Sequence, residues 1–155
     1  MPPKHLFGIL PLTWFYRGGR ATALGRGFSR FWAICAGLGL PPWRQTGLEL
    51  PGRKTGQRRR IAVVIARYAG QSFLVSMLGE CEWVRNARAS GRATLIGWRR
   101  QPVQLAEVPV AARGAIIQAY LRAAPGARPH IGLDASADLA ACQAVAPRHP
   151  VFRII

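Results

Sequence analysis

The sequence predicts a mainly β domain with peripheral helices, an α+β chain whose strands form a small antiparallel barrel. Short strand-like segments separated by tight turns run from residue 46 to about residue 109. One of them, residues 61–66, is apolar on both faces, which suits a barrel strand covered inside by a core and outside by a helix or a second subunit. The few helices are inserted among the strands, and this favours a barrel over a doubly wound sheet.

The chain divides into an N-terminal extension, residues 1–45, and a barrel domain, residues 46–155. The extension is Pro-rich at first and then amphipathic over residues 28–38, where one helical face carries Phe28, Phe31, Trp32, Cys35 and Leu38. This apolar run covers about half of the roughly 20 residues that a membrane-spanning helix needs. Because arginines lie just upstream, residues 17–38 form either a helix packed on the barrel or an interfacial helix on anionic lipid.

The barrel domain begins with strands expected at 47–50, 58–68 and 72–78, arranged as a meander with a break at 69–71. A helix is expected over 80–89, because two acids stand in its first turn and Gly91 follows its end. Two more strands are expected near 93–98 and 102–108. After them we expect a helix over 110–123, a loop through residue 129, a second helix opened by Asp134 or Ser136, and a closing strand over 151–155.

The composition indicates a globular protein with an anionic partner. The 155 residues include 22 Lys plus Arg against 6 Asp plus Glu, a formal charge of +16, while half of the residues are hydrophobic. The partner is therefore a nucleic acid, an anionic membrane face or a polyanionic small molecule. No aromatics are interleaved with the basic residues around 53–60 and no recognition helix stands out, so the sequence does not favour nucleic acid.

The cysteines and histidines point to a reducing cytoplasm and to no metal. Cys35, Cys81 and Cys142 are an odd count without a Cys-x-x-Cys pair, which argues against a disulfide framework and against a structural zinc site. The three histidines have no helical or hairpin spacing. We expect a cytoplasmic protein, with association at the inner face of the cell membrane as an alternative if residues 17–38 bind lipid.

A Gly-rich cationic turn is the strongest candidate for a binding site. Five of the eight residues from 53 to 60 are cationic, and they lie between two predicted strands. We expect Gly52 and Gly56 to adopt positive φ, which brings backbone N–H groups toward a ligand. The guanidinium groups offer forked donors suited to phosphate or carboxylate oxygens. The turn therefore predicts an anion site, although a solvated basic hairpin has the same composition.

Three motifs in fixed order resemble the deazaflavin-dependent nitroreductase family of the flavin/deazaflavin oxidoreductase superfamily. They are Gly52-Arg-Lys-Thr-Gly-Gln-x-Arg59, then Leu74-Val-Ser76, then Trp83-x-x-Asn86-x-x-Ala89. The resemblance covers residues 46–108 and extends into segments near 120–130 and 149–153, while residues 1–45 carry little of it. Relatives often place a short insert with Pro ahead of the Trp and a Lys or Gly where this chain has Glu80 and Glu82.

The resemblance implies a six-stranded split β-barrel of the FMN-binding type that binds the deazaflavin coenzyme F-420. It further implies hydride transfer from the reduced coenzyme, which carries a phosphodiester and glutamate carboxylates, to a quinone, nitro or enone acceptor. The implied coenzyme-binding residues are Arg53, Lys54, Thr55, Gly56, Gln57, Arg59, Ser76, Met77, Leu78, Trp83 and Asn86. The candidate catalytic residues are Tyr68, Ser76 and Tyr120.

Several alternatives remain open at this point. Related barrels bind FMN, haem or other tetrapyrroles, and the fold also suits a non-catalytic nucleic-acid or membrane module. Trp83 is either a core residue or a lid over the cofactor, and Tyr68 and Tyr120 are either packing residues or proton donors. Asn86 is either a contact to the ring or a surface residue, and Cys81 is expected to be a bystander. A homodimer would cover the outer face of the apolar strand.

Overall fold

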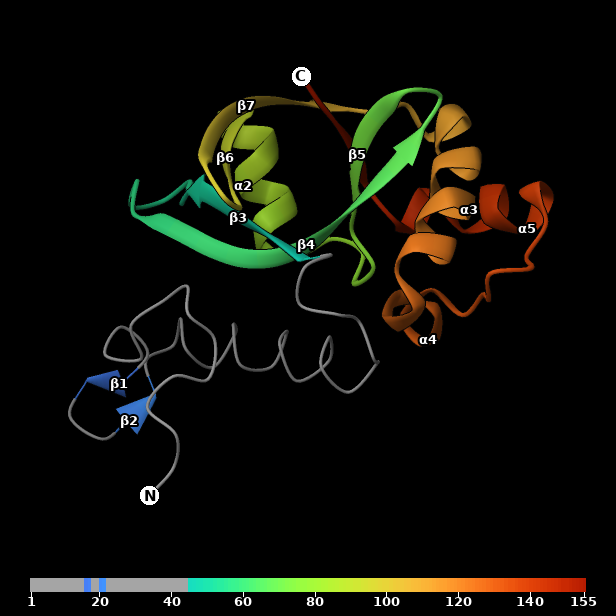
Figure 1. Cartoon of the computed structure of the whole chain (residues 1–155), viewed down its shortest axis with the longest axis horizontal. Helices are drawn as coiled ribbons and strands as arrows, with labels where there is room; N and C mark the ends of the chain where they lie inside the picture. Colours follow the sequence, from blue (N-terminus) through green and yellow to red (C-terminus); the bar gives the residue numbers. More distant parts are fainter. Residues whose placement is uncertain (1–15, 18–19, 22–44) are drawn as a thin grey trace.

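The computed structural model describes residues 16–17, 20–21 and 45–155. In the barrel domain, strands β3 to β8 close into one barrel in the order β3-β4-β5-β8-β7-β6, with every neighbouring pair antiparallel (Figure 1). Near the N-terminus, β1 (Tyr16–Arg17) pairs with β2 (Arg20–Ala21). The amphipathic helix predicted over 28–38 lies outside the described residues. The predicted antiparallel barrel of six strands is confirmed.

The strands lie close to their predicted positions. They are β3 (Gln45–Pro51), β4 (Arg58–Tyr68), β5 (Gln71–Val75), β6 (Arg92–Ile96), β7 (Arg100–Glu107) and β8 (Val151–Ile154). The predicted meander holds for β3, β4 and β5. The next position in the barrel belongs to β8, so the C-terminal strand separates β5 from β7 and lets the barrel close.

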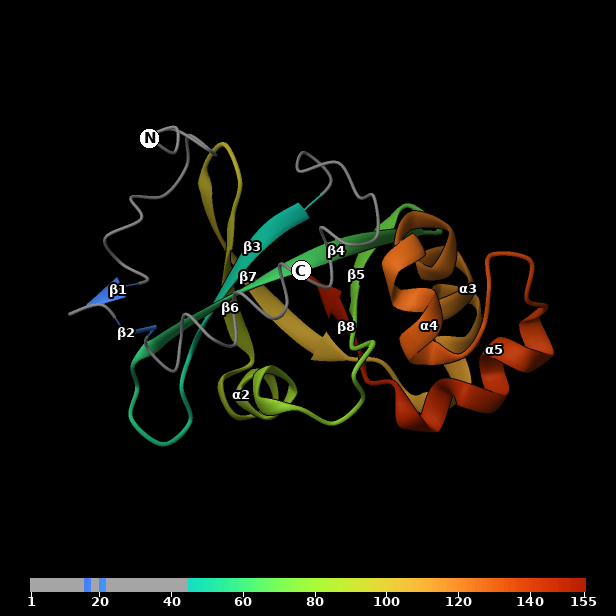
Figure 2. The same cartoon turned by 90° about the horizontal axis from the view of Figure 1, so that it is seen from below.

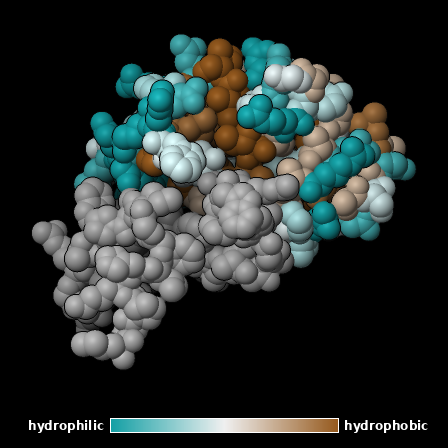
Figure 3. Space-filling view, in the orientation of Figure 1, coloured by the Kyte–Doolittle hydropathy of each residue, from teal (hydrophilic) through white to brown (hydrophobic). Residues whose placement is uncertain are grey.

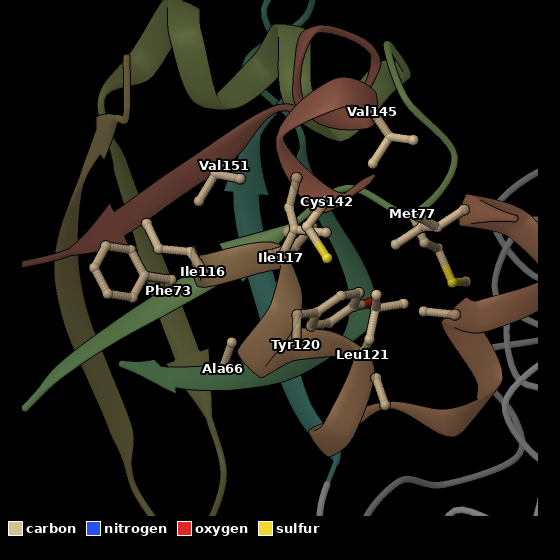
Figure 4. Close-up of a cluster of buried hydrophobic side chains, with 14 of the residues drawn as sticks. Ala66, Phe73, Met77, Ile116, Ile117, Tyr120, Leu121, Cys142, Val145 and Val151 are labelled. Carbon is tan, nitrogen blue, oxygen red and sulfur yellow. The ribbon is translucent and has the colours of Figure 1, made fainter. Parts of the chain in front are cut away.

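Strand β4 supplies residues to two separate cores, as its double apolar face predicts. Val63 packs inside the barrel, and Ile61 and Ile65 lie against the same interior cluster. Val64 and Ala66 point outward and pack beneath helix α3 (Arg113–Ala123). Figure 4 shows this outer cluster, in which Ile116, Ile117 and Tyr120 of α3 lie among the same buried side chains as Ala66 and Phe73. The alternation of side chains along one strand therefore joins the barrel to its helical layer.

The helical layer on this face is formed by α3, α4 (Arg128–Ile131) and α5 (Leu139–Val145), which lie together on one side of the barrel (Figure 2). The predicted start of the last helix is wrong. Asp138 caps α5 by accepting a hydrogen bond from the Ala141 N–H at 2.7 Å. Asp134 instead accepts bonds from the N–H and the hydroxyl of Ser136, which close a local turn. Both acids suit N-caps, and only the tertiary context decides between them.

Helix α2 (Glu82–Ser90) packs on the interior cluster away from the helical layer. Its buried residues Val84 and Ala87 belong to this cluster, and the Trp83 ring lies 5.6 Å from the Phe152 ring, centroid to centroid. Gly91, with φ of 62°, ends the helix as predicted. No helix in the described part of the chain is long and apolar enough to cross a membrane.

The packing of α3 on β4 predicts a large stability loss when its central contact is removed. Ile117 is fully buried, so Ile117→Ala should lower the free energy of unfolding by about 2–5 kcal/mol through lost burial and a residual cavity. Leu139→Ala is the control, because Leu139 is 53% exposed and should change stability by about 0.5 kcal/mol or less. Urea denaturation followed by circular dichroism measures both. Equal losses in the two variants would contradict the described packing.

Candidate functional site

The cationic turn between β3 and β4 is closed by its own backbone. The Gly52 N–H donates to the Gln57 carbonyl and the Gly56 N–H to the Gly52 carbonyl, each at 2.7 Å. Gly56 has the predicted positive φ, 68°, whereas Gly52 does not, so that part of the prediction is wrong. Gly52 is constrained by space instead, because a Cβ there would lie 3.1 Å from the Gln57 carbonyl oxygen. Thr55 Oγ1 accepts a bond from the Gln57 N–H. These contacts within the turn therefore hold its backbone in one conformation without a ligand.

The alternation of β4 sends the clustered arginines to different faces. Arg59 pairs with Leu50, whose side chain is in the barrel core, and therefore shares the inward face of the strand. Arg58 and Arg60 lie on the outward face with Glu49. The cations that are adjacent in sequence thus serve two environments. The sequence places all of them on one turn, and only the strand register separates them.

Glu49 organises the outward arginines. Its buried carboxylate accepts bonds from Arg60 Nε at 2.6 Å and Arg100 Nη2 at 2.6 Å, and Arg58 Nη1 lies 3.4 Å away. Burial by itself would raise the pKa of Glu49, but the bonds and charges of Arg60 and Arg100 outweigh it and lower the pKa. One carboxylate is thus surrounded by three guanidinium groups, which leaves the cluster positive. Sequence reasoning missed Glu49 and Arg100, although strand alternation places Glu49 outward.

Arg53 fastens the turn to α2. Its guanidinium donates to both carboxylate oxygens of Glu82, at 2.6 and 3.3 Å, and its backbone N–H donates to Asn86 Oδ1 at 3.1 Å. The bond to Glu82 raises the pKa of Arg53, and the same bond lowers the pKa of Glu82. Glu82 is therefore the counter-ion of the turn. Glu80 is likewise bonded to Arg88 on the same helix. The two acids that depart from the family pattern are both paired.

The loop after β5 is tied down at Ser76. The buried Ser76 hydroxyl donates to the Gly79 carbonyl at 2.6 Å and lies 3.5 Å from Cys81 Sγ. The Ser76 N–H donates to the Pro150 carbonyl, and the Ser76 carbonyl accepts a bond from His149 Nδ1 at 2.9 Å. Ser76 thus joins this loop to the C-terminal segment. His149, which the sequence did not single out as a site residue, completes the attachment.

The remaining predicted site residues fall into three groups. Lys54 and Thr55 are exposed on the turn, and Leu78 is 52% exposed on the loop after β5. Asn86 and Trp83 face the protein, one bonded to the Arg53 backbone and the other packed on Phe152. Met77 and Tyr120 are buried in the cluster beneath α3, while Tyr68 is exposed at the far end of β4. The fold brings Arg53, Glu82 and Asn86 together and places Tyr120 in a different core.

A groove of about 670 Å³ opens beside the turn. Ladder pairing between β3 and β6 ends at Glu49 and Thr94, and beyond it the β3–β4 and β6–β7 hairpins diverge. The lining residues are Glu49, Leu50, Pro51, Gly56, Arg58, Arg92, Ala93, Thr94, Pro102, Val103, Gln104 and Ile155. Hydrophilic residues predominate on the side of the domain that carries the β3–β4 hairpin (Figure 3). Arg92 and Gln104 were not predicted, because no motif marks them.

The donor set beside this groove fits an extended anion. Within residues 45–155, neither the Lys54 ammonium nor the Arg59 guanidinium has a hydrogen-bonded acidic partner, and the Lys54 and Thr55 N–H groups have no backbone acceptor. Glu49 is the groove's one acidic lining residue, and its charge is already compensated. In the same described part, no cluster of three His, Cys, Asp or Glu side chains could hold a metal ion.

The comparison with family models decides the affiliation. Residues 32–130 match the model described as F420H(2)-dependent quinone reductase. The chain belongs to this family. It is therefore an oxidoreductase that uses the reduced deazaflavin coenzyme F-420, and the predicted family, enzyme class and cofactor are confirmed. A comparison of this reductase with curated proteins finds no match.

Solved structures support the fold of the reductase. A protein described as a domain-swapped dimer covers 84% of this chain and 93% of its own, at 14% identity and a TM-score of 0.53. An F420-H2 dependent reductase, FDR-A, covers 72% and 94%, at 16% identity and a TM-score of 0.53. The conserved hypothetical protein Rv2991 from Mycobacterium tuberculosis covers 72% of both chains, at 15% identity and a TM-score of 0.52. At these identities the likeness shows the fold alone.

The Glu49 cluster predicts a stability effect that depends on pH. Glu49→Gln should lower the free energy of unfolding by about 1–3 kcal/mol near neutral pH, because guanidinium groups lose their shared counter-ion. Since the folded pKa of Glu49 lies below 4.5, its contribution is complete above that value and is lost as the pH falls through the folded pKa. Denaturation curves at several pH values test this. Glu80→Gln, at an exposed acid, should change little, and a difference between wild type and Glu49→Gln that persists in acid would contradict the account.

His149 predicts a second effect of pH on stability, which comes from a buried base rather than from a carboxylate. Burial lowers the pKa of His149 below its ordinary value of 6.5. The unfolded chain therefore takes up a proton near that value while the folded chain does not, so stability should decrease as the pH falls below about 6.5. Removing the titration in His149→Asn should flatten this part of the curve of unfolding free energy against pH. His130→Asn, at an exposed histidine, is the matched control. Parallel curves for wild type and His149→Asn would refute this assignment.

Proposed function

We propose that this family member transfers a hydride from reduced F-420 to an electrophilic small molecule, with a quinone as the preferred acceptor class. The observation that carries the proposal is the pair Lys54 and Arg59, two cations without hydrogen-bonded acidic partners in the described barrel, on a turn whose Gly56 and Arg58 line an open groove. The family description supports the quinone over the nitro and enone acceptors.

The anionic part of the coenzyme would bind along the turn and into the groove. Lys54 and Arg59 would hold the phosphodiester, together with the outward N–H groups of Lys54 and Thr55. Arg58 of β4 and Arg92 of β6, which both line the groove, would contact the glutamate carboxylates. Arg53 has a different role, because its guanidinium is bonded to Glu82. It would position the turn against α2, while Lys54 and Arg59 contact the ligand.

The chain contributes to the reaction by positioning the coenzyme ring and the acceptor. The bound reduced coenzyme supplies the hydride, so the protein must hold ring and acceptor in contact and exclude water. Ser76 is already bonded to Gly79 and fixes the loop that presents the exposed Leu78, which makes Ser76 a positioning residue and Leu78 the candidate contact to the ring. The buried location of Tyr120 makes a packing role the simpler interpretation.

Other functions make different spectroscopic and binding predictions. FMN would bind through one phosphate and lack the carboxylate tail, so it would leave Arg92 unused. Absorbance of the protein as isolated separates deazaflavin, flavin and haem. Residues 17–38, the predicted membrane contact, lie outside the described residues, and a cytoplasmic location stays a prediction. A homodimer also stays a prediction, motivated by the architecture of the domain-swapped neighbour.

Arg59→Ala should lower the affinity for F-420 by about 10- to 100-fold, because it removes a charge-assisted contact worth about 1.5–3 kcal/mol. Fluorescence titration of the coenzyme measures this directly. Arg67→Ala is the matched control, since Arg67 is an exposed arginine at the other end of the same strand. An affinity unchanged by Arg59→Ala would reject its role. Absence of binding at micromolar concentrations by the wild-type protein would reject the proposed function.

A further inference from the structure

The tip of the β6–β7 hairpin carries a tryptophan, Trp98, whose side chain is not buried against the domain. Strand β6 ends at Ile96, which pairs with Arg100 of β7, and the three residues between them form the turn. The turn is closed by a bond from the Gly97 N–H to the Arg99 carbonyl at 3.2 Å. The Trp98 side chain at its apex is 106% exposed. It therefore projects fully into solvent.

This exposure is unusual for a tryptophan. Large aromatic side chains gain more from burial than other residues and are highly buried on average. Trp83, in the same chain, is packed on Phe152. Another exposed aromatic, Tyr68 on the β4–β5 hairpin, is 44% exposed and keeps part of its surface against the protein. Trp98 thus offers its whole ring to a partner.

The charge around Trp98 is uniformly positive. Arg99 and Arg100 follow it directly and are exposed, and no acidic residue occurs between residues 92 and 104. Arg100 does contact Glu49, but that carboxylate is buried and shared with other guanidinium groups. A partner that approaches the tip therefore meets one aromatic ring and two cations without a competing exposed acid on the hairpin.

We propose that this hairpin tip docks on an anionic lipid bilayer, with Trp98 in the headgroup region and Arg99 and Arg100 against lipid phosphates. Tryptophan is enriched at membrane interfaces because its ring is apolar and its N–H can remain hydrogen-bonded. Each cation held near an anionic surface contributes about 1 kcal/mol. Single-stranded nucleic acid is the less suitable partner, because it requires several aromatics along a groove to stack successive bases. This docking does not depend on the proposed coenzyme site.

Co-sedimentation of the full chain with vesicles of phosphatidylglycerol and phosphatidylcholine tests the proposal. Trp98→Ala should weaken partitioning about 10-fold, through the loss of apolar burial. Arg99→Gln should weaken it about 5-fold, the equivalent of one cation near the surface. The matched controls, Tyr68→Ala and Arg67→Gln on the β4–β5 hairpin, should stay within about 2-fold of wild type. All four positions are exposed, and unchanged thermal melting would confirm that each variant folds.

Brominated acyl chains give a positional readout. They should quench part of the tryptophan fluorescence in wild type, and that part should disappear in Trp98→Phe while most of the binding is retained. The proposal is wrong if wild type does not bind anionic vesicles, or if Trp98→Ala and Tyr68→Ala weaken binding equally. It is also wrong if Trp98→Ala leaves binding unchanged, as expected of an anchor elsewhere in the chain. If Trp98→Ala loses retention on single-stranded DNA while its vesicle binding is unchanged, the tip binds nucleic acid instead.

Discussion

The two-residue period of β4 is the constraint on which the rest of the domain depends. Along this strand, one set of side chains enters the barrel and the other enters the core beneath α3. The same period continues into the basic end of the strand, where apolar residues are replaced by arginines. A shift of one residue in register would exchange the two sets and move an arginine into a position that now holds an apolar side chain. The register that builds the fold therefore also sorts the cations.

Two acidic residues complete this sorting. Glu49 gathers the outward arginines into a positive cluster, and Glu82 holds Arg53 against α2. These ion pairs do not neutralise the region, since Lys54 and Arg59 have no hydrogen-bonded acid in the described barrel. The acids thus determine which cations are structural and which are available to a ligand. Their position beside the turn explains how a chain with so few carboxylates can keep clustered guanidinium groups in place.

The sequence predicted the strands well because their signals are local. An apolar run flanked by Gly-containing turns marked β4 at its observed bounds, and Gly91 marked the end of α2. The start of α5 was missed because Asp134 and Asp138 are equally good caps and packing decides between them. The contacts of Glu49 with Arg100 and of Arg53 with Glu82 join residues 51 and 29 positions apart, a separation that no motif spacing reveals. The groove depends on where the β3–β6 ladder ends, which follows from the closure of the barrel.

A structure of the chain bound to F-420 tests the central claim most directly. The account predicts the phosphodiester against Lys54 and Arg59, the carboxylate tail between Arg58 and Arg92, and Arg53 still bonded to Glu82. A coenzyme bound elsewhere, with its anionic groups away from the β3–β4 turn and that groove empty, would contradict it.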